Sequence, residues 1–154
     1  MDYGAILKRL ADVVGPQYVS DKPFVLKAYA RDFGTMPPSQ PNLVVRPKTT
    51  EEVSEIVKIA NEFKVPIVPR GGGSAQEAGS TPPAGGGITI EMLRMNEILE
   101  IDETNATVTC QSGITYVNLM NTLELRGWKI GIAPSGAMAG TPGANWHESL
   151  ITTT

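Results

Sequence analysis

The sequence contains little of several residue types that would point to a particular function. It has one cysteine and one histidine in 154 residues, so we expect no internal disulfide and no multi-histidine metal site. Lys and Arg are scattered and the net charge is −3. This argues against a nucleic-acid partner, because nucleic-acid binding needs a basic face. No apolar run approaches the roughly 20 residues of a membrane span, and the charged N-terminal segment predicts no signal peptide and a cytoplasmic protein.

Glycine and proline are the abundant residues, and they are concentrated in two stretches, 66–87 and 131–143. In the first stretch, a short apolar segment at 66–68 predicts a buried strand. The run Pro69-Arg70-Gly71-Gly72-Gly73-Ser74 follows it directly. Glycines reach positive φ at little cost and can turn successive N–H groups to one side. Such a concavity binds anions, so the sequence predicts a phosphate-binding loop at the end of this strand.

Two common phosphate motifs do not fit this loop. A nucleoside-triphosphate loop needs Lys and Ser or Thr after its last glycine, whereas Ser74-Ala75-Gln76-Glu77 follows here. A dinucleotide-binding turn needs a helix directly after its glycines. Here the chain runs through Pro82, Pro83 and the glycines at 85–87 into an expected strand. What remains is a loop that binds an anion through its own N–H groups.

The pattern of apolar residues predicts an α+β protein in two lobes. A helix is expected at 4–14, and residues 17–41 are ambiguous except for a short helix from Pro23. The early part reads strand, helix, strand, which favours a small parallel βαβ lobe. The later part contains a hairpin, which favours a second, more antiparallel lobe. The expected strands are 42–46, 66–69, 88–90, 98–101 and 106–110. Two further helices are expected, one that begins at Thr49 with a Thr49-to-Glu52 capping box and one at about 115–126.

Four motifs in order resemble a known family. They are VVRPKTTEEV at 44–53, VPRGGGS at 68–74, GGGITIEMLRMNEILEID at 85–102 and QSGIT at 111–115. This order is similar to that of FAD-linked oxidases of the vanillyl-alcohol oxidase and para-cresol methylhydroxylase (PCMH) superfamily, in the glycolate oxidase and D-lactate dehydrogenase branch. The resemblance implies a PCMH-type FAD-binding fold. It implies that residues 42–154 are the N-terminal part of that domain, preceded by a helical segment at 1–41.

The resemblance also implies which residues hold the cofactor. The backbone of the glycine-rich loop would wrap the FAD pyrophosphate, and a second segment, after residue 131, would line the flavin. Thr141 followed by Pro142 also predicts the start of a helix. The implied cofactor-binding residues are Pro69, Arg70, Gly71, Gly72, Gly73, Ser74, Ala75, Gly79, Pro134, Thr141 and Gly143.

The sequence departs from the family pattern at several of these positions. Ala75, Ala78 and Ala144 stand where glycine is frequent, and each has less access to positive φ. Glu77 brings a negative charge near the expected pyrophosphate. The loop contains no His or Cys, so we expect non-covalent FAD.

The implied function is the FAD-binding portion of an oxidoreductase that oxidises a 2-hydroxy acid by hydride transfer to flavin. In the family the flavin domain continues and a substrate domain follows. We therefore assign no catalytic residue and expect the chain alone to be inactive. Either the chain is a fragment, or a second polypeptide or a second copy supplies the other half. The alternative is a non-catalytic flavin-domain remnant that self-associates without FAD. Flavin subunits of molybdenum hydroxylases and the enolpyruvyl reductase of cell-wall synthesis share the flavin fold but match the motifs less well.

Overall fold

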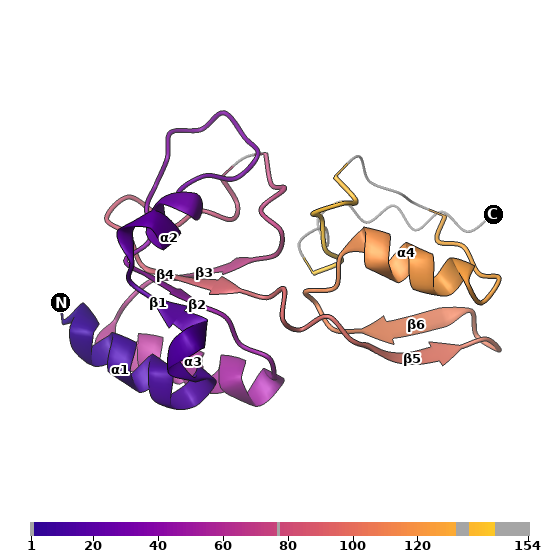
Figure 1. Cartoon of the computed structure of the whole chain (residues 1–154), viewed down its shortest axis with the longest axis horizontal. Coiled ribbons are helices and arrows are strands. Elements are labelled where there is room, and N and C mark those ends of the chain that lie inside the picture. The colour runs from indigo at the N-terminus through magenta and orange to yellow at the C-terminus, as the bar shows by residue number, and fades with distance from the viewer. Residues whose placement is uncertain (1, 77, 132–135, 144–154) are drawn as a thin grey trace.

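The computed structural model describes residues 2–76, 78–131 and 136–143, which form two lobes (Figure 1). The first lobe contains α1 (Tyr3–Val14), a short 3₁₀ helix η1 (Pro16–Tyr18), β1 (Val19–Ser20), α2 (Pro23–Ala28), β2 (Leu43–Val45), α3 (Thr50–Phe63), β3 (Ile67–Arg70) and β4 (Ile88–Glu91). The second lobe contains β5 (Ile98–Asp102), β6 (Thr107–Cys110) and α4 (Tyr116–Glu124). Among the described residues, none of the helices combines the length and the apolar character that a membrane span requires.

The first lobe is built on a four-stranded sheet with the order β1-β2-β4-β3. Strands β2 and β3 both run parallel to β4, which lies between them, and β1 pairs antiparallel with β2. Strand β2, helix α3 and strand β3 therefore form the parallel βαβ unit that the sequence predicts. Strand β3 is at one edge of the sheet, so the loop that follows Arg70 leaves from an edge.

Helices α1 and α3 cover one face of this sheet (Figure 1). Each begins at a capping side chain: Asp2 accepts a hydrogen bond from the Ala5 N–H at 3.1 Å, and Thr49 accepts one from the Glu52 N–H at 3.2 Å. The predicted capping box differs in one detail. The Glu52 carboxylate accepts from the Lys48 N–H, at 2.6 Å, one residue before the cap.

The first lobe contains a continuous hydrophobic core between the helices and the sheet. Alternate residues of each strand face the helices, as in β4, where Ile88 and Ile90 face them and Thr89 faces away. The buried members of this core are Ile6, Leu10, Val14, Val19, Leu43, Val45, Ile56, Ile59, Ala60, Val65, Ile88 and Ile90.

The second lobe is a hairpin covered by one helix. Strands β5 and β6 pair antiparallel, with an irregular register between Ile98 and Glu100. Asp102 organises the connecting turn by accepting hydrogen bonds from the N–H groups of Thr104 and Asn105 and from the Asn105 side chain. Helix α4 packs on this hairpin through Leu119 and Leu123. Together with Ile114, which precedes the helix, they are the buried residues of the second core.

The predicted α+β class, the parallel unit and the later hairpin are all confirmed. Residues 17–41, which the sequence leaves ambiguous, contain η1, β1 and α2. Strand β1 has only two residues, and its pairing with β2 through Val19 and Val45 has no periodic signal in the sequence. Helix α1 and strand β1 contribute to the same core as β2 and α3, and the division of the chain at residue 42 stays a prediction.

Candidate functional site

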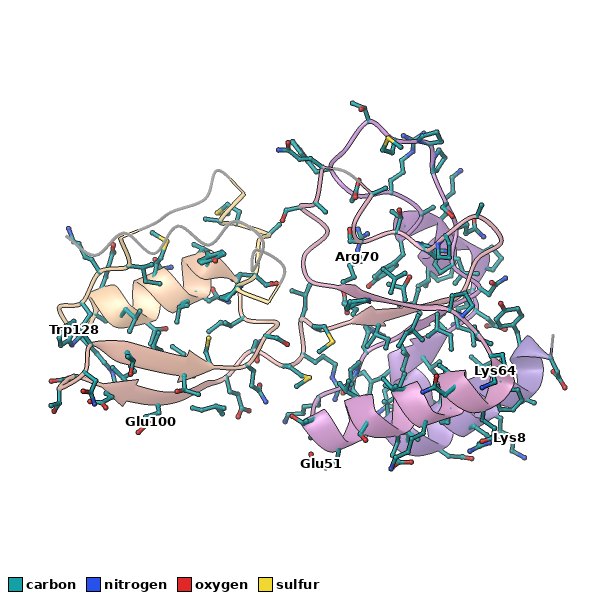
Figure 2. The ribbon with its side chains drawn as sticks, turned by 180° about the vertical axis from the view of Figure 1, so that it is seen from behind. Lys8, Glu51, Lys64, Arg70, Glu100 and Trp128 are labelled. Carbon is teal, nitrogen blue, oxygen red and sulfur yellow. The ribbon has the colours of Figure 1, made fainter. Side chains whose placement is uncertain are left out.

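The glycine loop, defined here as residues 71–75, begins where β3 ends. Strand β3 is parallel to β4, and Arg70 is in register with Glu91, the last residue of β4. Figure 2 shows Arg70 on the face of the sheet opposite α1 and α3. The chain continues through residues 76–87 without a helix among its described residues. The predicted absence of a helix dipole behind this loop is therefore confirmed for the part of 76–87 that the structure describes.

The N–H groups of the glycine loop have no partners within the described chain. None of the N–H groups of residues 71–75 donates a hydrogen bond to another described residue. Their carbonyl groups behave differently, because Gly73 and Ala75 both accept from the Phe33 N–H, at 3.1 Å each. All five residues are half-buried. The loop therefore presents a group of accessible donors, and this is the chemistry that an anion needs.

The three glycines are required for two different physical reasons. A Cβ atom at Gly71 would overlap the Thr141 hydroxyl group, and one at Gly72 would overlap the Ala139 carbonyl group. At these two positions the constraint is close approach of another segment. Only Gly73 has positive φ, at +74°, which favours glycine through backbone conformation.

The segment that approaches the glycine loop is residues 136–143, and it is anchored to the start of α4. The Tyr116 N–H donates to the Gly140 carbonyl at 3.0 Å, and the Val117 N–H donates to the Ala137 carbonyl at 3.1 Å. These are N–H groups of the first turn of α4, which have no partner inside a helix. Gly136 accepts from Gly140 in a tight turn. The site therefore joins an edge of the first lobe to the helix of the second.

The structure brings some of the predicted site residues together and leaves others apart. Thr141, only 1% exposed, lies against Gly71. Ser74 faces Gly136 and Gly140, with its Oγ 3.5 Å from the place of a Cβ on Gly140. Gly143 lies against Ser112 instead of the loop.

The remaining predicted residues lie at the margins of the site. Pro69 is in β3, and Gly79 is exposed, with a Cβ at that position 3.8 Å from the Ala75 Cβ. Pro134, Ala144 and Glu77 lie outside the described residues, as does the continuation of the helix predicted from Thr141. Ala78, which stands where glycine is frequent, adopts a φ of +58° nevertheless.

A polar cluster under the glycine loop was not predicted from the sequence. The Tyr29 hydroxyl donates to the Glu91 carboxylate at 2.7 Å, and the Arg70 guanidinium lies 5.3 Å from the centre of the Tyr29 ring. Burial, together with the Glu91 hydrogen bond, raises the pKa of the Tyr29 phenol well above its ordinary value. Burial lowers the pKa of Arg70. The only sequence signal was that Arg70 and Glu91 each directly follow an expected strand, 66–69 and 88–90.

Two cavities lie away from the glycine loop. One, of about 450 Å³, is between α2 and the strands β1 and β2 and includes Lys22, Phe24 and Arg46. The other, of about 410 Å³, is in the second lobe and includes Cys110 and Trp128. Neither contains a residue of the loop. Among the described residues, no group of three His, Cys, Asp or Glu side chains suits a metal ion.

Residues 41–150 match the FAD binding domain family. The chain is 35% identical over 144 residues to the glycolate oxidase subunit GlcD of Bacillus subtilis (strain 168), covering 94% of this chain and 30% of that protein. It is 33% identical over 144 residues to the mitochondrial D-lactate dehydrogenase (cytochrome) 1 of Saccharomyces cerevisiae, covering 88% of this chain and 24% of the relative. The chain spans less than a third of the length of these curated relatives.

The fold has a counterpart among solved structures. The crystal structure of p-cresol methylhydroxylase with substrate bound superposes with a TM-score of 0.82 at 23% identity, covering 93% of this chain and 28% of that chain. This likeness is one of fold. Together with the match over 41–150, it confirms the resemblance that the four motifs carry. The chain belongs to the FAD binding domain family, with a PCMH-type fold and sequence relatives in the glycolate oxidase and D-lactate dehydrogenase branch.

Proposed function

We propose that this chain binds the pyrophosphate of FAD through the glycine loop and forms the FAD-binding portion of a 2-hydroxy-acid oxidoreductase. The observation that carries the proposal is the set of N–H groups at residues 71–75 that donate no hydrogen bond within the described chain. The names of the relatives, a glycolate oxidase subunit and D-lactate dehydrogenases, support the substrate class.

The residues of the site fit a pyrophosphate group. Successive N–H groups in a loop with one positive φ form a concavity for phosphate oxygens. Gly71 and Gly72 leave no side chain between the loop and residues 139–141, so that segment packs directly against the loop. FAD, when bound, supplies an isoalloxazine ring that accepts a hydride. The role of this chain is to bind and orient the cofactor, and we assign none of its described side chains to the reaction itself.

The proposal includes non-covalent attachment of FAD. The one cysteine, Cys110, is on β6 and packs against the second core, away from the glycine loop. The expected result is that acid precipitation of the flavin-loaded protein leaves all the flavin in the supernatant. A cytoplasmic location and a second polypeptide or second copy that completes the flavin site belong to the same proposal, the location being supported by the low cysteine content.

The test of the site is a titration of the purified chain with FAD, with ADP and riboflavin as partial ligands. If the loop binds the pyrophosphate, FAD and ADP bind and compete, whereas riboflavin, which lacks phosphate, does not. Gly72→Ala inserts a methyl group against the Ala139 carbonyl. It is expected to weaken FAD and ADP binding about tenfold or more, the equivalent of one lost hydrogen bond to a charged group.

The matched control is Gly4→Ala, the same chemical change in α1, where the new Cβ meets only the end of the Asp2 side chain, at 3.3 Å. This variant is expected to bind FAD as the wild type does. Absence of FAD binding by the wild-type chain would contradict the proposal and favour a self-associating remnant, which size-exclusion chromatography of the same sample detects. Equal affinities of Gly72→Ala and Gly4→Ala would place the pyrophosphate elsewhere.

A further inference from the structure

The side chain of Arg70 turns back under the glycine loop and connects three segments of the chain. One terminal nitrogen, Nη2, donates to the Arg31 carbonyl at 2.9 Å. The other, Nη1, donates to the carbonyl and the hydroxyl of Ser80, at 3.3 Å each. A Cβ atom at Gly73 would overlap the guanidinium group. The planar fork of arginine is suited to this geometry, because its donors point in fixed and divergent directions.

The partners of this guanidinium are uncharged. Within the described residues, Arg70 forms no ion pair: Glu91 and one oxygen of Asp32 accept from other donors, and the second Asp32 oxygen is buried with no partner. Glu91 accepts from the Tyr29 hydroxyl at 2.7 Å, and one oxygen of Asp32 accepts from the Gly34 N–H at 2.9 Å. The Tyr29 ring packs against the guanidinium on one side. Arg70 therefore joins carbonyl groups and a ring, which is the arrangement of a structural connector.

The segment that Arg70 holds determines which way the glycine loop faces. The Phe33 N–H donates to the carbonyl groups of Gly73 and Ala75. Both carbonyls therefore point toward residues 31–33. Because a trans peptide places its N–H opposite its carbonyl, the contact at Gly73 turns the Ser74 N–H of the loop away from that segment. Arg31, whose carbonyl accepts from Arg70, is two residues before Phe33. Loss of the Arg70 hydrogen bond would release the segment that orients the two carbonyls.

We propose that Arg70 is a positioning residue for the cofactor loop: its side chain fixes residues 31–33 against Gly73, so that the N–H groups of residues 71–75 converge on one anion, and it does not itself contact phosphate. This inference rests on the proposed function for the identity of the anion. The orientation of the loop can be measured without it, because the Phe33 N–H reports on the same contact in the FAD-free protein.

The experiment compares Arg70→Lys, which keeps a positive charge and loses the fork, with Arg70→Gln, which loses both. The control is Arg9→Lys, on α1, where the exposed arginine bonds Glu62 at 2.7 Å and lies over Phe63. Site-resolved hydrogen exchange of FAD-free protein is expected to show the Phe33 N–H exchanging about tenfold faster in both Arg70 variants. The amides of β4 and all amides of the control are expected to keep their wild-type rates.

FAD titrations at several salt concentrations separate positioning from direct contact. Positioning predicts that Lys and Gln weaken binding by similar factors, about tenfold, and leave the salt dependence of the affinity unchanged. A direct contact with phosphate predicts that Lys retains most of the affinity, while Gln loses it and flattens the salt dependence. That second pattern would overturn the inference, as would wild-type exchange of the Phe33 N–H in Arg70→Lys.

Two further outcomes are informative. If the wild-type chain binds no FAD, the proposed function fails, and the exchange rates of the Phe33 N–H still decide whether Arg70 orients the loop. If the Arg70 variants do not fold, Ser80→Ala removes one acceptor of the guanidinium while leaving Arg70 in place. It is expected to accelerate Phe33 exchange by a smaller factor in the same direction, and an unchanged rate would count against the inference.

Discussion

The two lobes differ in how much core they have for the elements they contain. The first lobe buries twelve apolar residues between a four-stranded sheet and two helices. In the described part of the second lobe, three buried residues hold one helix on a two-stranded hairpin. Hairpins of two strands are marginally stable without further packing. The comparison indicates that the first lobe is a rigid support for the glycine loop, and that the second lobe depends more on its contacts with the loop and with neighbours.

Both lobes expose large apolar residues, such as Phe24 (72%) and Phe33 (78%) in the first lobe, so the lobes differ in how far their strands are buried. In the second lobe, Leu99 on β5 is 60% exposed and Leu125 at the end of α4 is 89% exposed. The strands of the first lobe that carry the core, by contrast, are buried at Leu43, Val45 and Ile88. An apolar residue that stays exposed contributes little to folding, since its surface is not removed from water.

The largest expected effect comes from truncating one core residue in each lobe. Ile88→Ala, in the centre of the first sheet, is expected to lower the free energy of unfolding by about 3–5 kcal/mol, because rigid surroundings keep the cavity open. Leu119→Ala, on α4, is expected to cost less, about 2 kcal/mol, because a small cluster can collapse around the change. Urea titration followed by far-UV circular dichroism reports mainly on α1 and α3, the longer helices.

A second signal isolates the second lobe. Trp128 packs against the second core, and in a Trp146→Phe background its fluorescence is the tryptophan signal of the chain. Leu119→Ala is expected to shift the fluorescence transition to lower urea with a smaller change in the dichroism transition. If both variants shift both signals equally, the lobes unfold as one unit and the comparison between them fails.

Most of the fold could be predicted because its elements carry periodic patterns. Helix α3 has apolar residues at helical spacing behind a capping threonine, and the strands on either side are short apolar runs bounded by proline and glycine. Strand β1 could not be predicted, because two residues are too few to show a period. Its existence depends on a long-range pairing with β2 that only the folded chain provides.

The sequence predicts the glycine loop of the candidate site, but it does not predict the residues that pack against that loop. Three consecutive glycines indicate that the loop acts through N–H groups, and the sequence alone is sufficient for that inference. That Gly71 and Gly72 are required by residues 139–141 depends on a contact across some 70 positions in the chain. The Tyr29–Glu91 hydrogen bond also joins distant residues, and neither side chain differs in sequence context from an ordinary surface residue.

An intermediate effect is expected at alkaline pH, where each lobe contains a group whose pKa burial raises. In the unfolded chain the Tyr29 phenol ionises at its ordinary pKa of 10.0. In the folded first lobe it stays protonated to a higher pH. The free energy of unfolding therefore falls as pH rises above about 10, and this contribution is fully present below that pH. Above that pH, Tyr29→Phe is expected to make the free energy of unfolding from the dichroism transition fall less steeply with pH, by roughly 0.5–1 kcal/mol per pH unit. The effect is limited because half of the Tyr29 side chain remains open to solvent.

The second lobe provides the counterpart of this test. Burial raises the pKa of the Cys110 thiol above its ordinary 9.0, so the stability of the second lobe is expected to fall at a lower pH, from about 9. Cys110→Ala is expected to flatten the pH dependence of the fluorescence transition and leave that of the dichroism transition unchanged. Loss of the pH dependence of both transitions in either single variant would show that the lobes are coupled.

The smallest expected effect uses one strained residue in each lobe. Lys64, which ends α3, has a φ of +56°, and Ala106, in the turn between β5 and β6, has a φ of +52°. Each pays about 1–2 kcal/mol for a left-handed conformation, and glycine would lose about 0.5–1 kcal/mol more chain entropy on folding. Lys64→Gly is therefore expected to raise the urea midpoint of the dichroism transition, and Ala106→Gly that of the fluorescence transition. Each increase corresponds to roughly 0.5 kcal/mol in the free energy of unfolding. If Ala106→Gly instead raises both midpoints equally, the two lobes unfold as one unit. Relief of strain in the hairpin turn then stabilises the sheet of the first lobe to the same extent.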